Sequence, residues 1–170
     1  MYKATKRWLT DVIVSPALYG RALCPFAAGP FHRKPLSKLR ISVTECSEEE
    51  ELLQLVRDEL DFLFPAGVPA GDVPETTLLV APNHFQNDYR AMVHFSWNIM
   101  SHITSSAHLN QKVQVVNFHP QAVHSLMDIG GFEDGSSFSI RSPFPTFHFL
   151  REGDILKAVQ SGYPNPEVAT

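Results

Sequence analysis

Short runs of apolar and β-branched residues recur along the chain and predict four strands. Apolar residues alternate with polar ones over residues 39–43, which is the period-two pattern of a half-buried strand. The run T-T-L-L-V-A over residues 76–81 is almost continuously apolar and follows a proline, as in a central strand covered on both faces. Two further strands are predicted over residues 113–118 and 146–150.

Apolar residues three and four positions apart predict helices before, between and after these strands. The helices are expected over residues 4–14, 48–64, 86 to about 104, and 154–159. The second of them has the strongest signal, because Ser47 and Glu50 match a capping box and acidic residues crowd the first turn. Its buried stripe is predicted to consist of Leu52, Leu53, Val56, Leu60 and Leu63.

The order of these elements predicts an α/β fold. Strand, capped helix, strand, helix and strand follow one another, which is the order found in layered α/β proteins. We expect a small mixed sheet of about four strands with helices packed on it, in a single domain over residues 1–170. A mobile loop is expected over residues 65–74, a lid-like loop over 121–140 and an extended tail over 163–170.

Composition and charge argue against several classes of protein. The net charge of -4 and the pI near 6.0 argue against nucleic-acid binding through an excess of Lys and Arg. The sequence has no apolar run of the roughly 20 residues that span a bilayer, so no membrane partner is expected. The first residues lack the apolar core of a secretory signal. We therefore expect an intracellular, cytoplasmic protein, with an organelle reached through a removed targeting segment as the alternative.

The segment R-S-P-F-P-T-F-H-F-L-R-E over residues 141–152 concentrates reactive groups on a stiff backbone. Two prolines restrain its first half to an extended conformation. Arg141, His148, Arg151 and Glu152 then place two cations, an imidazole and a carboxylate among aromatic residues. Because buried charges need partners, this density favours a functional site over a plain core strand.

Several phrases of the sequence occur together in a set order. They are L-C-P-F-A at 23–27, E-T-T-L-L-V at 75–80, F-H-P at 118–120, R-S-P-F-P at 141–145, H-F-L-R-E at 148–152 and Y-P-N-P-E at 163–167. In this order and spacing the chain resembles the family called domain of unknown function 1415 over nearly its whole length. The resemblance implies which positions matter but no established activity.

The chain departs from the pattern of that family in three places. Gln121 and Ala122 stand where an acidic and an aromatic residue are usual, Ile140 stands where Asn is frequent, and the polar residues beyond the tail are absent. The departures affect any role that needs those groups. They leave the candidate site residues Cys24, His119, Arg141, His148, Arg151 and Glu152 intact.

One hypothesis for the site is a metal centre. Ligands of open α/β sheets bind beyond the carboxyl ends of strands, and His119 follows directly on a predicted strand. Cys24, His119 and His148 would offer a thiolate and two imidazoles, which suit zinc or a similar divalent metal with water in the fourth position. The alternative is structural, with each of these residues satisfied inside the core. We favour a site without metal.

A second hypothesis is a small-molecule enzyme without metal that acts on an anionic substrate. Arg141 and Arg151, with Asn83 at a strand end, would bind the anion. His119 or His148 would act as general acid or base, Glu152 would orient an imidazole, and Cys24 would be the nucleophile. The alternative for Arg141, Arg151 and Glu152 is a structural ion-pair network.

A third hypothesis is a binding or assembly protein without chemistry. The helix that begins near Gln86 carries His94, Trp97 and His102 on or near its second face. It is the surface expected to form a homodimer if the protein has one. Thiol–disulfide exchange between Cys24 and Cys46 is the remaining alternative, and only the helix that follows Cys46 supports it.

Overall fold

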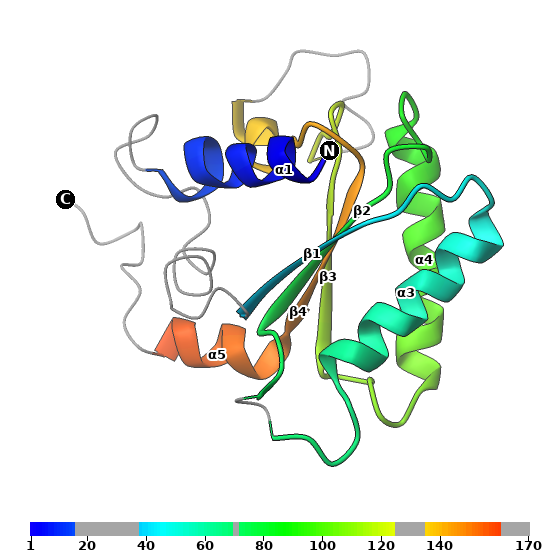
Figure 1. Ribbon diagram of the computed structural model, residues 1–170, viewed down its shortest axis with the longest axis vertical. Helices are drawn as coiled ribbons and strands as arrows, with labels where there is room; N and C mark the ends of the chain where they lie inside the picture. The colour runs from blue at the N-terminus through cyan, green and yellow to red at the C-terminus, as the bar shows by residue number, and fades with distance from the viewer. Residues whose placement is uncertain (16–37, 70–71, 125–134, 161–170) are drawn as a thin grey trace.

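The computed structural model describes residues 1–15, 38–69, 72–124 and 135–160, and within them it shows a mixed four-stranded sheet. The strands are β1 (Leu39–Val43), β2 (Thr76–Val80), β3 (Val113–Phe118) and β4 (Thr146–Arg151). They lie side by side in the order β1-β2-β4-β3 (Figure 1). The predicted α/β fold with a small mixed sheet is confirmed.

The directions of the strands decide which loops meet. β1 is parallel to β2, and β4 runs antiparallel to both β2 and β3. It follows that β1, β2 and β3 all point the same way. The segments that follow these three strands therefore meet at one edge of the sheet, which we call the carboxyl edge.

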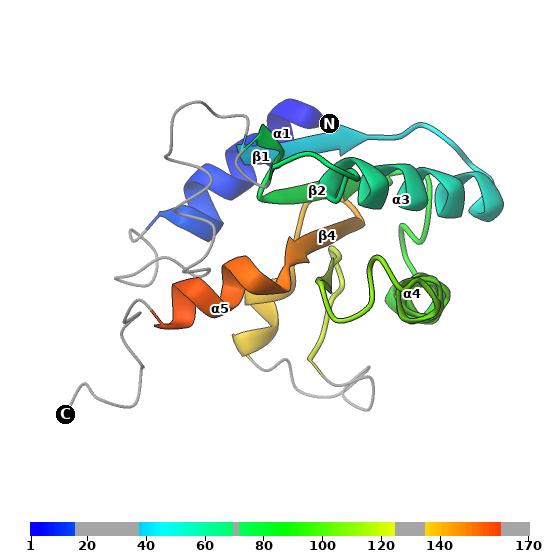
Figure 2. The same cartoon turned by 90° about the horizontal axis from the view of Figure 1, so that it is seen from below.

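Helices cover both faces of the sheet. α3 (Glu49–Leu63) and α4 (Tyr89–Ser105) lie on one side, and α1 (Tyr2–Trp8) with the π-helical turn η1 (Leu9–Val14) lies on the other (Figure 2). The 3-10 helix η5 (Gly135–Ile140) leads into β4, and α5 (Glu152–Gln160) follows it.

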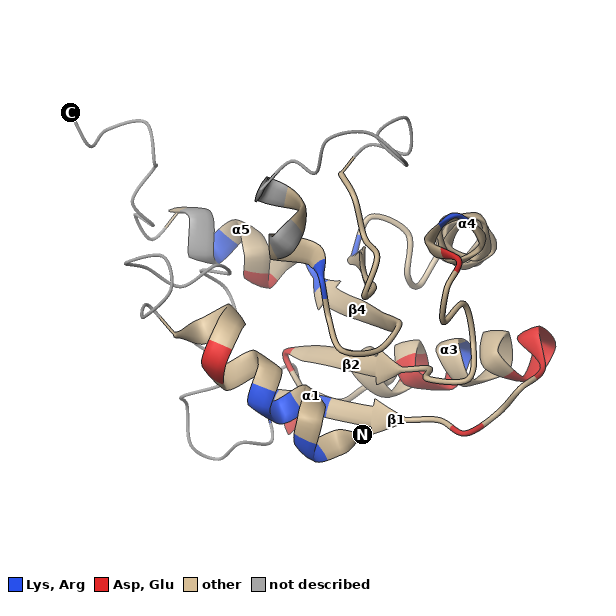
Figure 3. Cartoon of the chain, turned by 90° about the horizontal axis from the view of Figure 1, so that it is seen from above, with Lys and Arg blue, Asp and Glu red and all other residues tan. Residues whose placement is uncertain are grey.

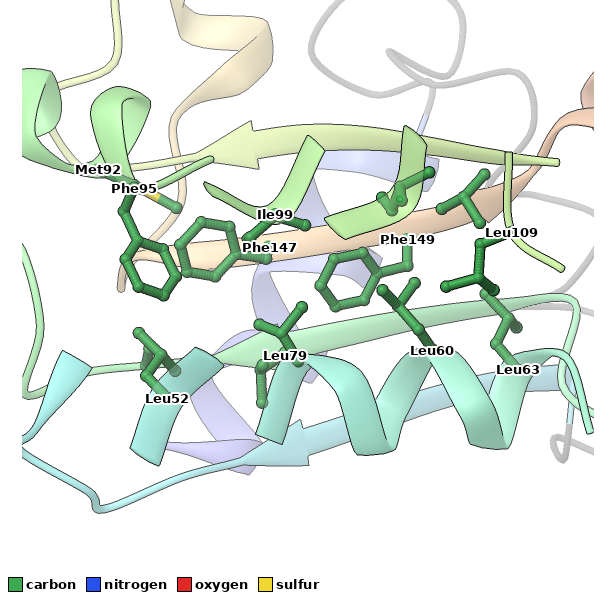
Figure 4. Packing of buried hydrophobic residues seen from close by; sticks show 14 residues of the cluster. Leu52, Leu60, Leu63, Leu79, Met92, Phe95, Ile99, Leu109, Phe147 and Phe149 are labelled. Atoms are coloured by element: carbon green, nitrogen blue, oxygen red, sulfur yellow. The ribbon is translucent and has the colours of Figure 1, made fainter. Parts of the chain in front are cut away.

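The larger apolar core lies between the sheet and helices α3 and α4. Phe147 and Phe149 of β4 are fully buried there, together with Leu79 of β2 and the apolar faces of both helices (Figure 4). The smaller core lies under α1, where the rings of Trp8 and Phe118 meet edge to face at 5.2 Å. Because side chains alternate along β4, its odd-numbered residues face α3 and α4 and its even-numbered residues face α1.

Local details at the helix ends differ from the predictions. The capping box at Ser47 and Glu50 is wrong: Glu48 is the N-cap of α3 and its side chain makes no capping hydrogen bond. The acidic first turn still suits the helix dipole. The first helix begins earlier than predicted, at Tyr2, and its second half is π-helical. In α4, Asp88 caps the helix by accepting from Ala91 N–H at 2.9 Å.

A buried carboxylate ties α3 to the edge strand β1. Arg40 binds both carboxylate oxygens of Glu59, at 2.7 and 3.0 Å, and its guanidinium lies 4.4 Å from the centre of the Phe62 ring. The hydrogen bonds that Arg40 donates to Glu59 raise the pKa of Arg40. The pair lies toward the far end of the sheet from the carboxyl edge.

Some of the predicted features lie outside the described residues. They are Cys24, residues 125–134 of the expected lid loop and the whole tail over 163–170. Residues 70 and 71 of the loop over 65–74 also lie outside. Within the described ranges, no helix combines the length and apolar character needed to cross a membrane.

Candidate active site at the carboxyl edge

His148 lies inside the protein, on the face of β4 that is turned toward α1. Its ring packs against Phe118, with centroids 5.8 Å apart. Its Nε2 lies 2.5 Å from Thr76 Oγ1, and the Thr76 hydroxyl donates to the Phe149 carbonyl at 2.9 Å. Because the hydroxyl has one proton, His148 Nε2–H is the donor to Thr76. Burial lowers the pKa of His148 to about 4, so the ring is neutral near neutral pH.

His119 follows β3 and is fully buried, with both ring nitrogens bonded to the backbone. Nε2–H donates to the Phe85 carbonyl at 2.6 Å, and the Gln121 N–H donates to Nδ1 at 2.9 Å. Burial lowers the pKa of His119, against smaller opposing effects of the Phe85 hydrogen bond and the Asp88 charge. The ring also packs against Tyr89 at 5.5 Å between centroids. The hydrogen bond to Phe85 joins the end of β3 to the loop that follows β2.

The two arginines predicted to bind an anion contact backbone carbonyls of neighbouring segments. Arg141 Nε donates to the Ala122 carbonyl at 3.2 Å. Arg151 Nη2 donates to the carbonyl of Leu63, the last residue of α3, at 3.2 Å, and Arg151 Nη1 lies 3.8 Å from Asp154 Oδ2. Carbonyls at the end of a helix lack intrahelical partners and favour a cation, so Arg151 stabilises the end of α3.

The sheet places the predicted site residues in different parts of the structure. His148 and Arg151 point to opposite faces of β4, because they are three positions apart. Glu152 begins α5 beside Arg151, at the edge opposite to the carboxyl edge. His119 lies three residues beyond the β3 partner of His148, which is about 10 Å along the strand. Arg141 lies beside His119 at the carboxyl edge, because the His119 N–H donates to the Ile140 carbonyl at 3.2 Å. Cys24 lies outside the described ranges.

The thiol of Cys46 and the imidazole of His84 meet at the carboxyl edge. The sequence analysis does not predict this pair. Cys46 lies three residues after β1, and His84 lies four residues after β2. The Cys46 Sγ and the His84 Nε2 are 3.4 Å apart, within hydrogen-bonding distance for sulfur. The His84 side chain is buried at 5% exposure, whereas Cys46 is half-buried. Cys46 also packs against the edge of the larger apolar core.

Three hydrogen bonds fix the two loops that carry this pair. The Thr44 N–H donates to the Val80 carbonyl at 3.0 Å, which extends the pairing of β1 with β2. The Thr44 hydroxyl accepts from the Cys46 N–H at 3.2 Å. The Asn83 side-chain amide donates to the Glu45 carbonyl at 2.8 Å. Asn83, predicted to bind substrate, therefore joins the Cys46 loop to the His84 loop.

The chemistry available to this pair is nucleophilic. A thiol beside an imidazole can give its proton to the ring and attack an electrophile. The first amides of α3, which have no acceptor within the helix, begin three residues after Cys46 and can donate to a developing negative charge. Among the described residues, no three His, Cys, Asp or Glu side chains are grouped so as to hold a metal ion. Catalytic zinc sites usually have three protein ligands, and this pair supplies two.

A family model described as a protein of unknown function (DUF1415) matches residues 1–169 of the chain. The chain belongs to the DUF1415 family. The predicted resemblance is confirmed. Comparisons of this DUF1415 protein with curated proteins and with solved structures find no match.

The sequence of this DUF1415 chain does contain a signal for the Cys46–His84 pair. Both residues lie a few positions after strands that were predicted in the right places. Neighbouring parallel strands bring such positions to the same edge. The sequence analysis relates Cys46 only to Cys24, because the local pattern does not reveal that β1 and β2 are neighbours in the sheet.

Proposed function

We propose that this DUF1415 protein is a small-molecule enzyme whose nucleophile is Cys46 and whose general base is His84. The observation that carries the proposal is the 3.4 Å contact between Cys46 Sγ and His84 Nε2 at the carboxyl ends of two neighbouring parallel strands. Open α/β sheets bind their ligands at this edge. Cys46 thus replaces Cys24 as the proposed nucleophile, because Cys46 has an imidazole partner within the described residues.

The proposed reaction is acyl transfer through a thioester. Cys46 Sγ attacks the carbonyl carbon of the substrate while its proton moves to His84 Nε2. When the bond to the leaving group breaks, the protonated imidazole returns that proton to the departing atom. Water then attacks the thioester carbon, gives a proton to the ring, and the carbon–sulfur bond breaks with the proton returning to the sulfur.

The test uses a neutral ester and a chain with a single cysteine. In the Cys24→Ser protein, p-nitrophenyl acetate is expected to acylate Cys46 at least about tenfold faster than it acylates N-acetylcysteine amide at the same pH. Release of p-nitrophenolate gives the rate, and mass spectrometry locates the acetyl group. His84→Gln is expected to remove the advantage, and Cys46→Ser to abolish the adduct.

The comparison with the free thiol keeps the test decisive even if a substitution of the buried His84 unfolds the chain. Acylation of Cys46 at the rate of N-acetylcysteine amide would rule out the enzyme. So would a folded His84→Gln protein, judged by its thermal unfolding, that acylates as fast as its parent.

A second candidate function is assembly through the outer face of α4. Trp97 is 62% exposed and stacks on His94, with ring centroids 4.7 Å apart, and Met100 beside it is also exposed. A large exposed aromatic patch of this kind favours a protein partner. This observation supports a homodimer, which is compatible with catalysis at the carboxyl edge.

A further inference from the structure

The loop and the helical turn next to Cys46 carry an excess of negative charge. Five exposed carboxylates lie within five residues of Cys46 on the loop after β1 and the first turn of α3 (Figure 3). They are Glu45, Glu48, Glu49, Glu50 and Glu51. In the described part of the chain none of the five forms an ion pair.

Among the residues that the structure describes, few positive charges lie near this site in the sequence, and Arg90 in the first turn of α4 is the nearest one to His84. The two segments that carry the thiol and the imidazole, residues 41–56 and 76–89, contain no Lys or Arg. Arg40 lies toward the other end of β1, bound to Glu59. Arg141 lies at the β3 end of the carboxyl edge, where its Nε donates to the Ala122 carbonyl at 3.2 Å.

The dipole of α3 does not reverse this balance. A helix N-terminus is equivalent to roughly half a positive charge, and its effect falls off within the first turn. The five carboxylates carry ten times that charge with the opposite sign. They outweigh the helix dipole and leave a negative excess toward solvent, so an approaching anion is repelled.

From this arrangement we infer that the Cys46–His84 site acts on small molecules that carry a positive charge. The inference rests on the proposed function and adds the substrate class to it. It differs from the anionic substrate predicted from Arg141 and Arg151, because those two side chains contact backbone carbonyls away from Cys46. A protonated amine close to the electrophilic centre fits the acidic rim.

The test measures the charge preference of Cys46 with three disulfides of similar size. Cystamine is dicationic, bis(2-hydroxyethyl) disulfide is neutral and dithiodiglycolate is dianionic. In each reaction the Cys46 sulfur forms a new S–S bond, the S–S bond of the reagent breaks, and the released thiolate takes up a proton. Rates are measured in the Cys24→Ser protein and divided by those of 2-mercaptoethanol, which removes the intrinsic reactivity of each reagent.

The expected result is a normalised rate for cystamine that exceeds the rate for dithiodiglycolate by roughly tenfold at low salt, with the neutral reagent between them. The ratio should fall toward one in high salt, because the carboxylates are exposed. The variant Glu48→Gln/Glu49→Gln is expected to reduce the ratio severalfold.

A matched control removes the same charge from the distant half of the same helix. Asp58→Asn/Asp61→Asn is expected to leave the ratio nearly unchanged. Equal normalised rates for the cationic and anionic reagents, or an equal effect of the two double variants, would overturn the inference. This outcome can be told apart from failure of the proposed function. In that case p-nitrophenyl acetate would acylate Cys46 no faster than it acylates a free thiol.

Discussion

His148 makes the stability of this protein depend on pH in a predictable direction. In the unfolded chain its imidazole takes up a proton below the ordinary pKa of 6.5, whereas the buried ring does so only near pH 4. Protons therefore bind the unfolded state first. The stabilisation is complete above pH 6.5 and is lost as the pH falls from 6.5 toward 4.

The magnitude follows from the difference between these two values. Each pKa unit corresponds to about 1.4 kcal/mol, so the full loss approaches about 3 kcal/mol. Between about pH 7 and about pH 5 the linkage relation gives about 2 kcal/mol from this residue alone. That is a large part of the roughly 5–15 kcal/mol by which domains are stable.

The variant His148→Leu isolates this contribution. Leucine suits the apolar face shared with Leu78 and Val116, and the Thr76 hydroxyl keeps its bond to the Phe149 carbonyl, so no polar group is orphaned. Urea unfolding followed by circular dichroism at both pH values gives the free energies of unfolding of the two proteins. Wild type is expected to lose about 2 kcal/mol more than the variant on acidification.

Equal losses in the two proteins would refute the reasoning, because they would mean that the folded ring takes up its proton as easily as the unfolded one. His119, whose pKa is also lowered by burial, contributes in the same direction in both proteins and cancels in the difference. Carboxylates that titrate in this range cancel in the same way.

Two further predictions concern the end of α3 and the outer face of α4. Arg151→Leu removes a charged donor from the Leu63 carbonyl and is expected to lower the free energy of unfolding, measured in urea, by about 1–3 kcal/mol. The control Lys157→Leu removes the other cation near Asp154, at a side chain that is 77% exposed, and should cost less than about 1 kcal/mol. Equal losses in the two variants would contradict the role of Arg151. Trp97→Lys is expected to convert a dimer to a monomer in light scattering coupled to size exclusion, and a monomeric wild type would remove the assembly candidate.

The strands could be predicted closely because their signals are local. Residues 39–43 and 113–118 match β1 and β3 in their bounds, and a fully buried run marks β2 as a central strand. What the pattern could not reveal is the place of β4. It follows β3 in the chain yet lies between β2 and β3, and nothing within residues 146–150 distinguishes that position from an edge.

The same limit explains the outcome for the candidate site. His148, Arg151 and Glu152 are close together in the sequence, but the two faces and two ends of the sheet separate their side chains from those at the carboxyl edge. Cys46 and His84 are 38 residues apart and meet only because β1 and β2 are parallel neighbours. Residues that are close in the sequence of one strand can thus point to opposite faces of the sheet, because side chains alternate. Residues that are far apart in the sequence can share a site where parallel strands end.

The position of β4 also has a consequence for how the protein is made. Among the described residues β3 pairs only with β4, and β2 has β1 on its other side, so β4 joins the two halves of the sheet. During synthesis β3 cannot form its pairing with β4 until residue 151 has left the ribosome. A chain that ends before β4 exposes unpaired edges on β2 and β3 and is expected to aggregate. Completion of the sheet during synthesis therefore depends on this late segment.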